Sequence, residues 1–286
     1  MAAISHIEKT ANNYSHESFE MTTLDHDDHS FCGIMFDVNV DAKDMPVDCF
    51  QIEEVSVRGG LGQITVWVTD QSWKGKHNRR TKWKMLYNEF HTPSYRNLQP
   101  LKFPEPLQLI PGESVGLYIH SAALNDDSIV YDNQRRVANH DEFITISPGI
   151  AHLDCNAFGE NAPWGGPAWR QGRTFVGRIS YGVRYQLWTP DVTHRFPSQF
   201  RYASSAFCNV HAFAWKGLPL DIIKYILNMC PPSWFDCPGA LSLKKHRDLP
   251  DQPGFLFSSI AGNTNWEEAA DNSVVIRYFE RCCNIL

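Results

Sequence analysis

Hydrophobic and polar residues alternate with a period of two along much of the first two thirds of the chain. The stretch GIMFDVNV is a clear example, because one set of alternate positions holds Ile34, Phe36, Val38 and Val40. Successive side chains of a β-strand point to opposite faces of a sheet, so this spacing is typical of a half-buried strand. The pattern predicts a strand that begins near Gly33.

The same alternation recurs in VDCFQIEEVSV, QITVWV, SVGLYIH and DEFITIS, and Gly or Pro residues separate these segments. Between the first two lies RGGLG, in which Gly59, Gly60 and Gly62 can adopt positive φ angles. This favours a tight hairpin, so we expect VDCFQIEEVSV and QITVWV to pair with each other. Pro148 and Gly149 are predicted to end the DEFITIS strand.

The longest alternation is TFVGRISYGVRYQLW, in which Phe175 to Leu187 predict one continuous strand. Many short strands joined by Gly and Pro turns indicate a mainly β protein. The fold expected for residues 31–190 is an antiparallel β-sandwich.

The two flanking regions differ from this pattern. Residues 1–30 carry few large apolar side chains and predict a disordered tail. Residues 191–286 predict a small helical region, with one helix in GLPLDIIKYILNMCPP and a second, amphipathic helix in TNWEEAADNSVVIRYFERCC. The first helix carries an apolar stripe formed by Ile222, Ile223, Ile226 and Leu227.

Composition narrows the class of protein. The chain has 286 residues, a formal net charge of −6 and 43% hydrophobic residues, which suits a globular protein and makes nucleic acid an unexpected partner. No apolar run approaches the roughly 18 residues of a membrane span, and the first residues do not resemble a secretory signal. The eight cysteines are scattered. We therefore expect a cytoplasmic protein, or one at the cytosolic face of a membrane.

Two loops are candidate binding surfaces. The first, WKGKHNRRTKWKML, combines aromatic residues with the cations Lys74, Lys76, Arg79, Arg80 and Lys82, and Trp83 follows them. Such a loop could hold phosphates or lipid headgroups, and the alternative is a solvated loop. The second, NAPWGGPAWRQGR, holds Trp164, Trp169, Arg170 and Arg173. Exposed Trp rings in a rigid loop often anchor a peptide or a sugar, although these rings could instead plug the end of the sandwich.

The ending CNIL fits the pattern for prenylation. Cys283 would carry a geranylgeranyl group, because Leu286 is terminal, and Cys282 could carry a palmitoyl chain. One prenyl chain binds membranes only weakly, so a second signal matters, and the helix before it lacks a basic cluster. The alternative is a C-terminal helix that docks on the domain.

Two resemblances accompany these patterns. The strand order around "MF-x-V" and the turn PGESVGLY resembles an uncharacterised β-sandwich domain of algal and other eukaryotic proteins and, more distantly, PHR domains. That resemblance implies a jelly-roll-like recognition domain over residues 31–190, with a recognition surface on loops and no chemistry of its own. The segment from Leu218 to Leu227, with Pro219, Ile222, Ile223 and Ile226, is similar to the first helix of an F-box. It implies docking to an adaptor of a cullin ubiquitin ligase, whereas a short helix packed on the sandwich is the alternative.

No catalytic motif is present. The chain lacks G-x-S-x-G, P-loop and dinucleotide patterns, and its His, Asp and Cys residues lack the spacing of a metal site. We therefore expect no catalytic residue, no cofactor and no metal. The predicted function is a non-catalytic protein-recognition sandwich tethered to membranes by prenylation. The alternatives are an F-box-like substrate adaptor and a carbohydrate-binding sandwich.

Overall fold

The structure is a computed structural model, and it describes residues 14–26, 29–42, 45–124, 127–133, 138–198, 200–202, 204–205, 208 and 219–229. The chain divides into two compact units. The first unit comprises Met1–Lys43 and Val47–Gln186, and the second comprises Asp44–Pro46 and Leu187–Leu286. Each unit is described by itself.

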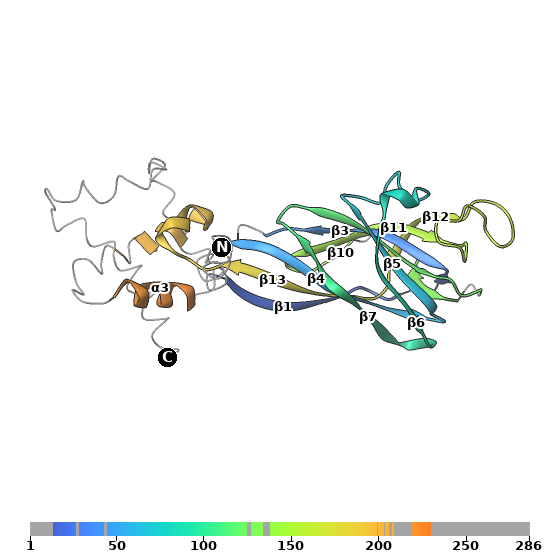
Figure 1. Cartoon of the computed structure of the whole chain (residues 1–286), viewed down its shortest axis with the longest axis horizontal. Coiled ribbons are helices and arrows are strands. Elements are labelled where there is room, and N and C mark those ends of the chain that lie inside the picture. The colour runs from blue at the N-terminus through green and yellow to red at the C-terminus, as the bar shows by residue number, and fades with distance from the viewer. Residues whose placement is uncertain are drawn as a thin grey trace, which may run out of the picture. The chain divides into compact units, whose positions relative to one another are not determined.

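The first unit is an antiparallel β-sandwich, as the alternating pattern predicted (Figure 1). Its smaller sheet has four strands in the order β1-β13-β4-β7. These strands are β1 (Tyr14–Thr22), β13 (Arg178–Gln186), β4 (Val47–Gly59) and β7 (Ser94–Leu109).

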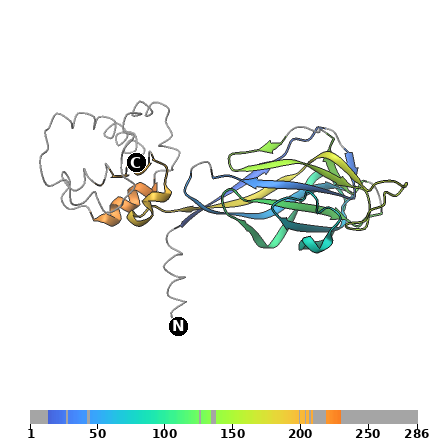
Figure 2. The same cartoon turned by 90° about the horizontal axis from the view of Figure 1, so that it is seen from above.

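The larger sheet has nine strands in the order β2-β9-β12-β11-β3-β8-β5-β6, with β10 paired to β11 outside this path. Figure 2 shows the strands of this unit from above. The strands are β2 (His29–Phe31), β9 (Ile129–Asp132), β12 (Trp169–Phe175), β11 (Ile144–His152), β3 (Gly33–Val40), β8 (Ser114–Ser121), β5 (Gly62–Asp70), β6 (Lys84–His91) and β10 (Asn139–His140). A short 3-10 helix, η1 (Arg80–Lys82), precedes β6.

Strand β3 is buried on both of its faces. Ile34, Phe36 and Val38 are fully buried on one face of the strand. Met35 lies on the other face and is equally buried, in a second cluster. This cluster contains Met35, Trp67, Trp73, Trp83, Tyr118, Ile150 and Phe158. Both faces of the larger sheet are therefore buried, and loops cover the face that carries Met35.

Residues 1–30 are not a disordered tail throughout, so that prediction was wrong for the segment that forms β1. All nine residues of β1 pair with β13. Phe19 stacks on Tyr181 at 5.5 Å, and Met21 is buried. Because β1 is an edge strand with an open outer face, most of its side chains are polar, and this hides the strand signal.

The expected hairpin between β4 and β5 is absent from the described part of the chain. β4 pairs with β13 and β7, whereas β5 pairs with β6 and β8. The glycine turn between them therefore carries the chain from one sheet to the other. Backbone bonds from Gly60 N to Asp127 O and from Leu61 N to Ser128 O hold this crossing in place.

The segment Phe175 to Leu187 is also not one continuous strand. Phe175 ends β12 in the larger sheet, and β13 begins at Arg178 in the smaller sheet. Gly177 allows the change of sheet, because a Cβ there would overlap the carbonyl oxygen of Ser56. Both strands alternate with a period of two, so their joined sequence conceals the corner.

The second unit contains the predicted helix. Its described elements are η2 (Pro190–Arg195) and α3 (Leu220–Met229). Ile223 and Leu227 pack in a cluster with Trp188, Phe196 and Phe200, whereas Ile222 is exposed. Asn228 bonds both the N–H and the C=O of Trp188. No helix in the described ranges is long and apolar enough to cross a bilayer.

Several predictions concern parts of the chain outside the described residues. They are the C-terminal amphipathic helix, the prenylation and palmitoylation sites Cys283 and Cys282, and Leu218. These stay predictions.

Strand β11 continues past the proline and glycine that were expected to end it. Its pairing with β3 shifts register between Ser147 and Ile150, so Pro148 and Gly149 form a bulge inside the strand. A Cβ on Gly149 would overlap the carbonyl oxygen of Met35. Only glycine therefore allows this close approach of β11 to β3.

We expect Gly149→Ala to lower the free energy of unfolding by more than about 3 kcal/mol, because β11 would have to move away from β3. Gly112→Ala is the matched control. Its new methyl group would meet no described atom within 4 Å, and only the positive φ of 84° opposes it. That strain costs about 1 kcal/mol. Urea unfolding compares the two variants, and equal losses would contradict the tight contact.

Candidate ligand-binding site

The loop between β5 and β6, residues 71–83, is held by strand β3. The carboxylate of Asp37 accepts hydrogen bonds from Ser72 Oγ at 2.6 Å and from the Trp73 backbone N–H at 2.9 Å. At the other end of the loop, Trp83 Nε1 donates to the Lys76 carbonyl at 2.9 Å. Buried indoles and a buried carboxylate thus fix the backbone that carries the basic side chains.

A second loop, residues 153–168, is fixed by two buried histidines. Tyr118 donates its hydroxyl proton to His152 Nδ1 at 2.7 Å, and His152 Nε2 lies 2.9 Å from the Gly159 carbonyl. His120 Nε2 lies 3.0 Å from the Asp154 carbonyl. A carbonyl can only accept, so the proton of each neutral ring is on Nε2. These contacts tie the loop to β8 and β11.

Both rings are held neutral. Burial lowers the pKa of His120 to about 4, although its bond to the Asp154 carbonyl acts in the opposite direction. Burial also lowers the pKa of His152 to about 4, against the effect of its bond to the Gly159 carbonyl. Burial likewise raises the pKa of Tyr118 well above its usual value. The network therefore has one stable protonation pattern near neutral pH.

Asp154 shapes the start of the second loop. Its carboxylate accepts bonds from the backbone N–H of Asn156 at 2.8 Å and of Asn161 at 3.3 Å. Burial alone would raise the pKa of this carboxyl, but the bonds from Asn156 and Asn161 outweigh burial and lower it. An ionised Asp154 thus satisfies loop N–H groups that face inward.

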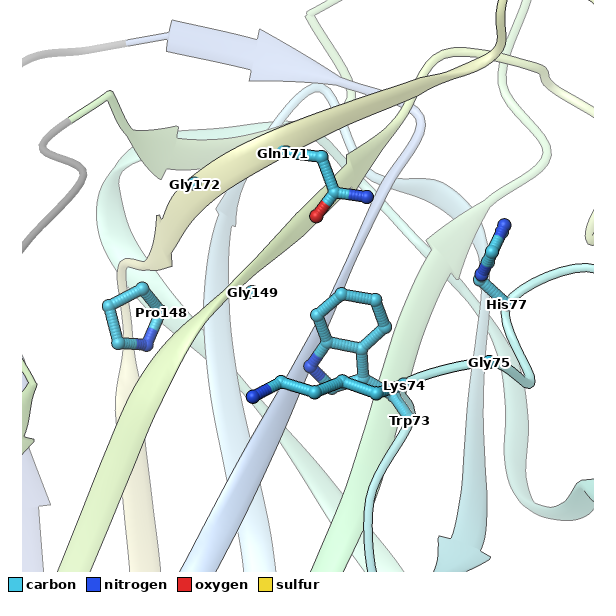
Figure 3. A pocket seen from close by; sticks show the side chains of 8 residues that line it. All are labelled: Trp73, Lys74, Gly75, His77, Pro148, Gly149, Gln171 and Gly172. Atoms are coloured by element: carbon cyan, nitrogen blue, oxygen red, sulfur yellow. The ribbon is translucent and has the colours of Figure 1, made fainter.

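A pocket of about 340 Å³ lies where the first loop meets β11 and β12 (Figure 3). It is lined by Trp73, Lys74, Gly75, His77, Pro148, Gly149, Gln171 and Gly172. Figure 3 shows Lys74 and Pro148 on one side, His77 on the other, and the amide of Gln171 above the Trp73 indole. The β11 bulge supplies Pro148 and Gly149, so a distortion of the sheet helps to form the pocket.

The residues predicted from the basic loop have different environments. Lys74 lines the pocket, Arg79 and Lys82 are exposed, and the Lys76 ammonium bonds the Asp70 carbonyl. Arg80 lies over the Trp67 ring at 5.2 Å. Trp83 is only 7% exposed and packs in the aromatic cluster, so its ring supports the loop and does not face solvent.

The residues predicted from the tryptophan loop also have different environments. Trp164 is 57% exposed and contacts Phe31, whereas Trp169 is half-buried and stacks on His152 at 3.9 Å. Arg170 and Arg173 donate hydrogen bonds to the carbonyls of Pro167 and Gln171. Only Trp164 therefore presents a largely open indole.

The structure brings the two predicted loops together. His77 of the first loop meets the Trp169 ring edge to face at 5.3 Å, and Asn78 lies 3.5 Å from the Glu160 carboxylate. Sequence reasoning did not name Pro148, Gly149, Gln171 and Gly172 as site residues. The last two lie within the predicted tryptophan loop, which from Trp169 onward is strand β12 and not a loop. The dipeptide Pro-Gly within an otherwise apolar strand was the available signal, because it can mark a bulge as well as a strand end.

Ring nitrogens near this pocket lack hydrogen-bond partners. Trp73 Nε1 and His77 Nδ1, which belong to lining residues, and Trp169 Nε1, which lies outside the lining, are buried atoms with no partner among the described residues. Leaving such a group unpaired costs about 1–3 kcal/mol. Lys74 has no ion-pair partner in the described part of the chain, and no lining residue carries a carboxylate. The pocket therefore suits a ligand rich in acceptors.

The same geometry gives no sign of catalysis. The hydrogen-bonded pair Tyr118 and His152 is fully buried, so a substrate cannot reach it. Within the described ranges, no three His, Cys, Asp or Glu side chains are placed to hold a metal ion. What the arrangement can do chemically is bind: it offers a rigid aromatic floor, N–H donors and a cation.

Comparison with known proteins yields little. No family model matches the chain. No curated protein matches it either. Two solved structures of infectious bursal disease virus are similar to it. The T13 particle shares 12% identity with a TM-score of 0.23, over 76% of this chain and 53% of that chain. The Gx strain structure shares 10% with a TM-score of 0.21, over 74% and 51%. The chain thus spans about half the length of both viral chains, and such scores carry no argument about function.

The neutral histidines predict a dependence of stability on pH. An unfolded imidazole binds a proton near pH 6.5, whereas each folded ring resists protonation until about pH 4. Stability is therefore fully present above pH 6.5 and falls as the pH drops toward 4, by about 3 kcal/mol per ring. Urea unfolding between pH 7 and 5 measures this slope.

His120→Gln should reduce that slope by roughly one proton, whatever it does to stability at pH 7. His140→Gln is the control, because His140 is exposed in β10, and it should leave the slope unchanged. If the free energy of unfolding depended on pH with the same slope in both variants, His120 would not be held neutral in the folded protein.

Proposed function

We propose that this protein is a non-catalytic recognition module that binds a partner protein at the pocket between residues 71–83, β11 and β12. The loop of residues 71–83, the β11 bulge and β12 enclose one preformed cavity with binding chemistry, and this arrangement carries the proposal. Recognition sites are commonly placed on loops that a rigid sheet positions. The distant resemblance to PHR domains, which recognise partners through loops, agrees with it.

Rigidity supports the same conclusion. The first loop is bonded to Asp37, and the second is bonded to His152 and His120. A surface that is ordered before binding loses less conformational entropy when a partner docks. The aromatic cluster beneath the pocket therefore acts as a support for the binding residues.

Filling the pocket should abolish partner binding. Gln171 is exposed in β12, and we expect Gln171→Trp to weaken partner binding at least roughly tenfold by occupying the cavity with an indole. Gln108→Trp makes the same change at an exposed position of β7, in the other sheet, and should have no effect. Affinity purification on the full-length chain identifies partners, and calorimetry with each purified partner measures the dissociation constants. Equal binding by both variants would overturn the proposal.

A substrate adaptor of a cullin ubiquitin ligase is the second candidate. It is favoured by α3, where Ile222, Tyr225 and Met229 are exposed apolar residues on a helix that resembles the start of an F-box. The same purification distinguishes this function. An adaptor would retain a cullin adaptor subunit, lose it on Ile222→Glu with Tyr225→Glu, and keep it on Gln171→Trp.

We also propose that prenylation of Cys283 tethers the module to membranes, as the CNIL pattern indicates. Intact mass spectrometry of protein from eukaryotic cells should find a prenyl group and the loss of the last three residues. Cys283→Ser should restore an unmodified chain that ends at Leu286, and the control Cys282→Ser should keep the prenyl group. An unmodified wild-type terminus would exclude the tether.

A further inference from the structure

Two buried ring nitrogens of residues that line the pocket have no hydrogen-bond partner among the described residues. Trp73 is 5% exposed, and its Nε1 has no hydrogen-bond partner in the described part of the chain. Its indole nitrogen lies on the side of the ring where Lys74 and Pro148 are found (Figure 3). His77 Nδ1 is buried and unpartnered in the same region. Ligand atoms that accept hydrogen bonds would satisfy groups that the fold leaves unpaired.

The charged residue that lines the pocket is cationic, and the Asp37 carboxylate that bonds the Trp73 backbone N–H is not among the lining residues. Lys74 lines the pocket, and Arg79 and Lys82 are exposed on the same loop. None of the lining residues is acidic. The whole chain nevertheless carries a formal net charge of −6. A cationic loop on an acidic protein provides local charge complementarity, which selects an acidic partner and rejects a basic one.

We propose that the pocket binds the carboxylate of an Asp or Glu side chain from the partner protein, a proposal that rests on the recognition function above. The Lys74 ammonium pairs with the carboxylate. The Gln171 amide donates to its oxygens, and Pro148 with the Trp73 ring contacts the aliphatic part of the same residue. A charge-assisted hydrogen bond is roughly twice as strong as a neutral one.

Other ligand classes fit this lining less well. An apolar side chain would leave the indole and imidazole nitrogens unpaired and would desolvate Lys74. A sugar hydroxyl needs acceptors as well as donors, and among the lining side chains the Gln171 carbonyl is the neutral acceptor. A basic side chain would be repelled by Lys74. The carboxylate is the group that uses the donors and the charge together.

A random peptide library displayed on phage, selected on the immobilised full-length chain, tests this. We expect one Asp or Glu position to be enriched on the wild-type chain. Lys74→Glu should lose that enrichment and select Lys or Arg instead. Lys102→Glu makes the same charge change at an exposed position of β7 and should select the same peptides as wild type.

The selected peptides then give the affinity. Replacing the enriched acid by Ala should raise the dissociation constant for the wild-type chain roughly tenfold, and replacing it by Lys should restore binding to Lys74→Glu. Peptides that bind wild type but not Gln171→Trp, without an acidic preference, would overturn this inference and leave the recognition function intact. Peptides that bind Gln171→Trp as well as wild type would overturn both.

Discussion

The larger sheet has apolar residues on both faces, and the rest of the site depends on covering the outer one. Met35, Trp67 and Tyr118 point away from the sandwich interior and would otherwise expose large apolar surfaces. Residues 71–83 and 153–168 fold over them and contribute Trp73, Trp83 and Phe158 to the same cluster. Burial of an aromatic side chain is worth about 1.5–3 kcal/mol, so the loops gain stability by lying on the sheet. The pocket is the gap that remains where residues 71–83 reach the β11 bulge and β12.

Hydrogen bonds to buried polar side chains hold these two loops in defined positions on the sheet. Asp37 lies in β3 and binds the first loop, and His152 in β11 binds the second. Each contact satisfies a group that would otherwise be buried without a partner, so the loop positions are specified as well as stabilised. Because His152 also stacks on Trp169, and Trp169 meets His77, the two loops share one continuous set of ring contacts. A rigid site results from packing that also serves the fold.

Around the pocket the arrangement is different, because several donors remain unpaired there. Trp83 Nε1 and Trp67 Nε1 have partners within the fold, at the Lys76 carbonyl and at Thr65 Oγ1. Trp73 and Trp169, in the same aromatic region, have none among the described residues. Buried unpaired donors reduce stability, and they are expected where a ligand supplies the missing acceptor. Paired and unpaired indole N–H groups therefore lie within one aromatic region.

Local periodicity in the sequence was sufficient to identify six of the thirteen described strands, namely β3, β4, β5, β8, β11 and β13, together with the mainly β class and helix α3. It could do so because side-chain periodicity is set by the backbone of each element alone. Periodicity could not reveal that β4 and β5 belong to different sheets or that Gly177 divides one alternating run. It also could not reveal that the polar strand β1 forms the edge of the smaller sheet. All three features depend on contacts with strands that are distant in the sequence. Both candidate binding loops were proposed from their tryptophans and cations. Their meeting at one pocket, the burial of Trp83, and the contribution of Pro148, Gly149 and Gln171 were decided by the tertiary structure. The physical reason is that a pocket is a relation between segments far apart in sequence, and only packing of the whole sheet brings these segments together.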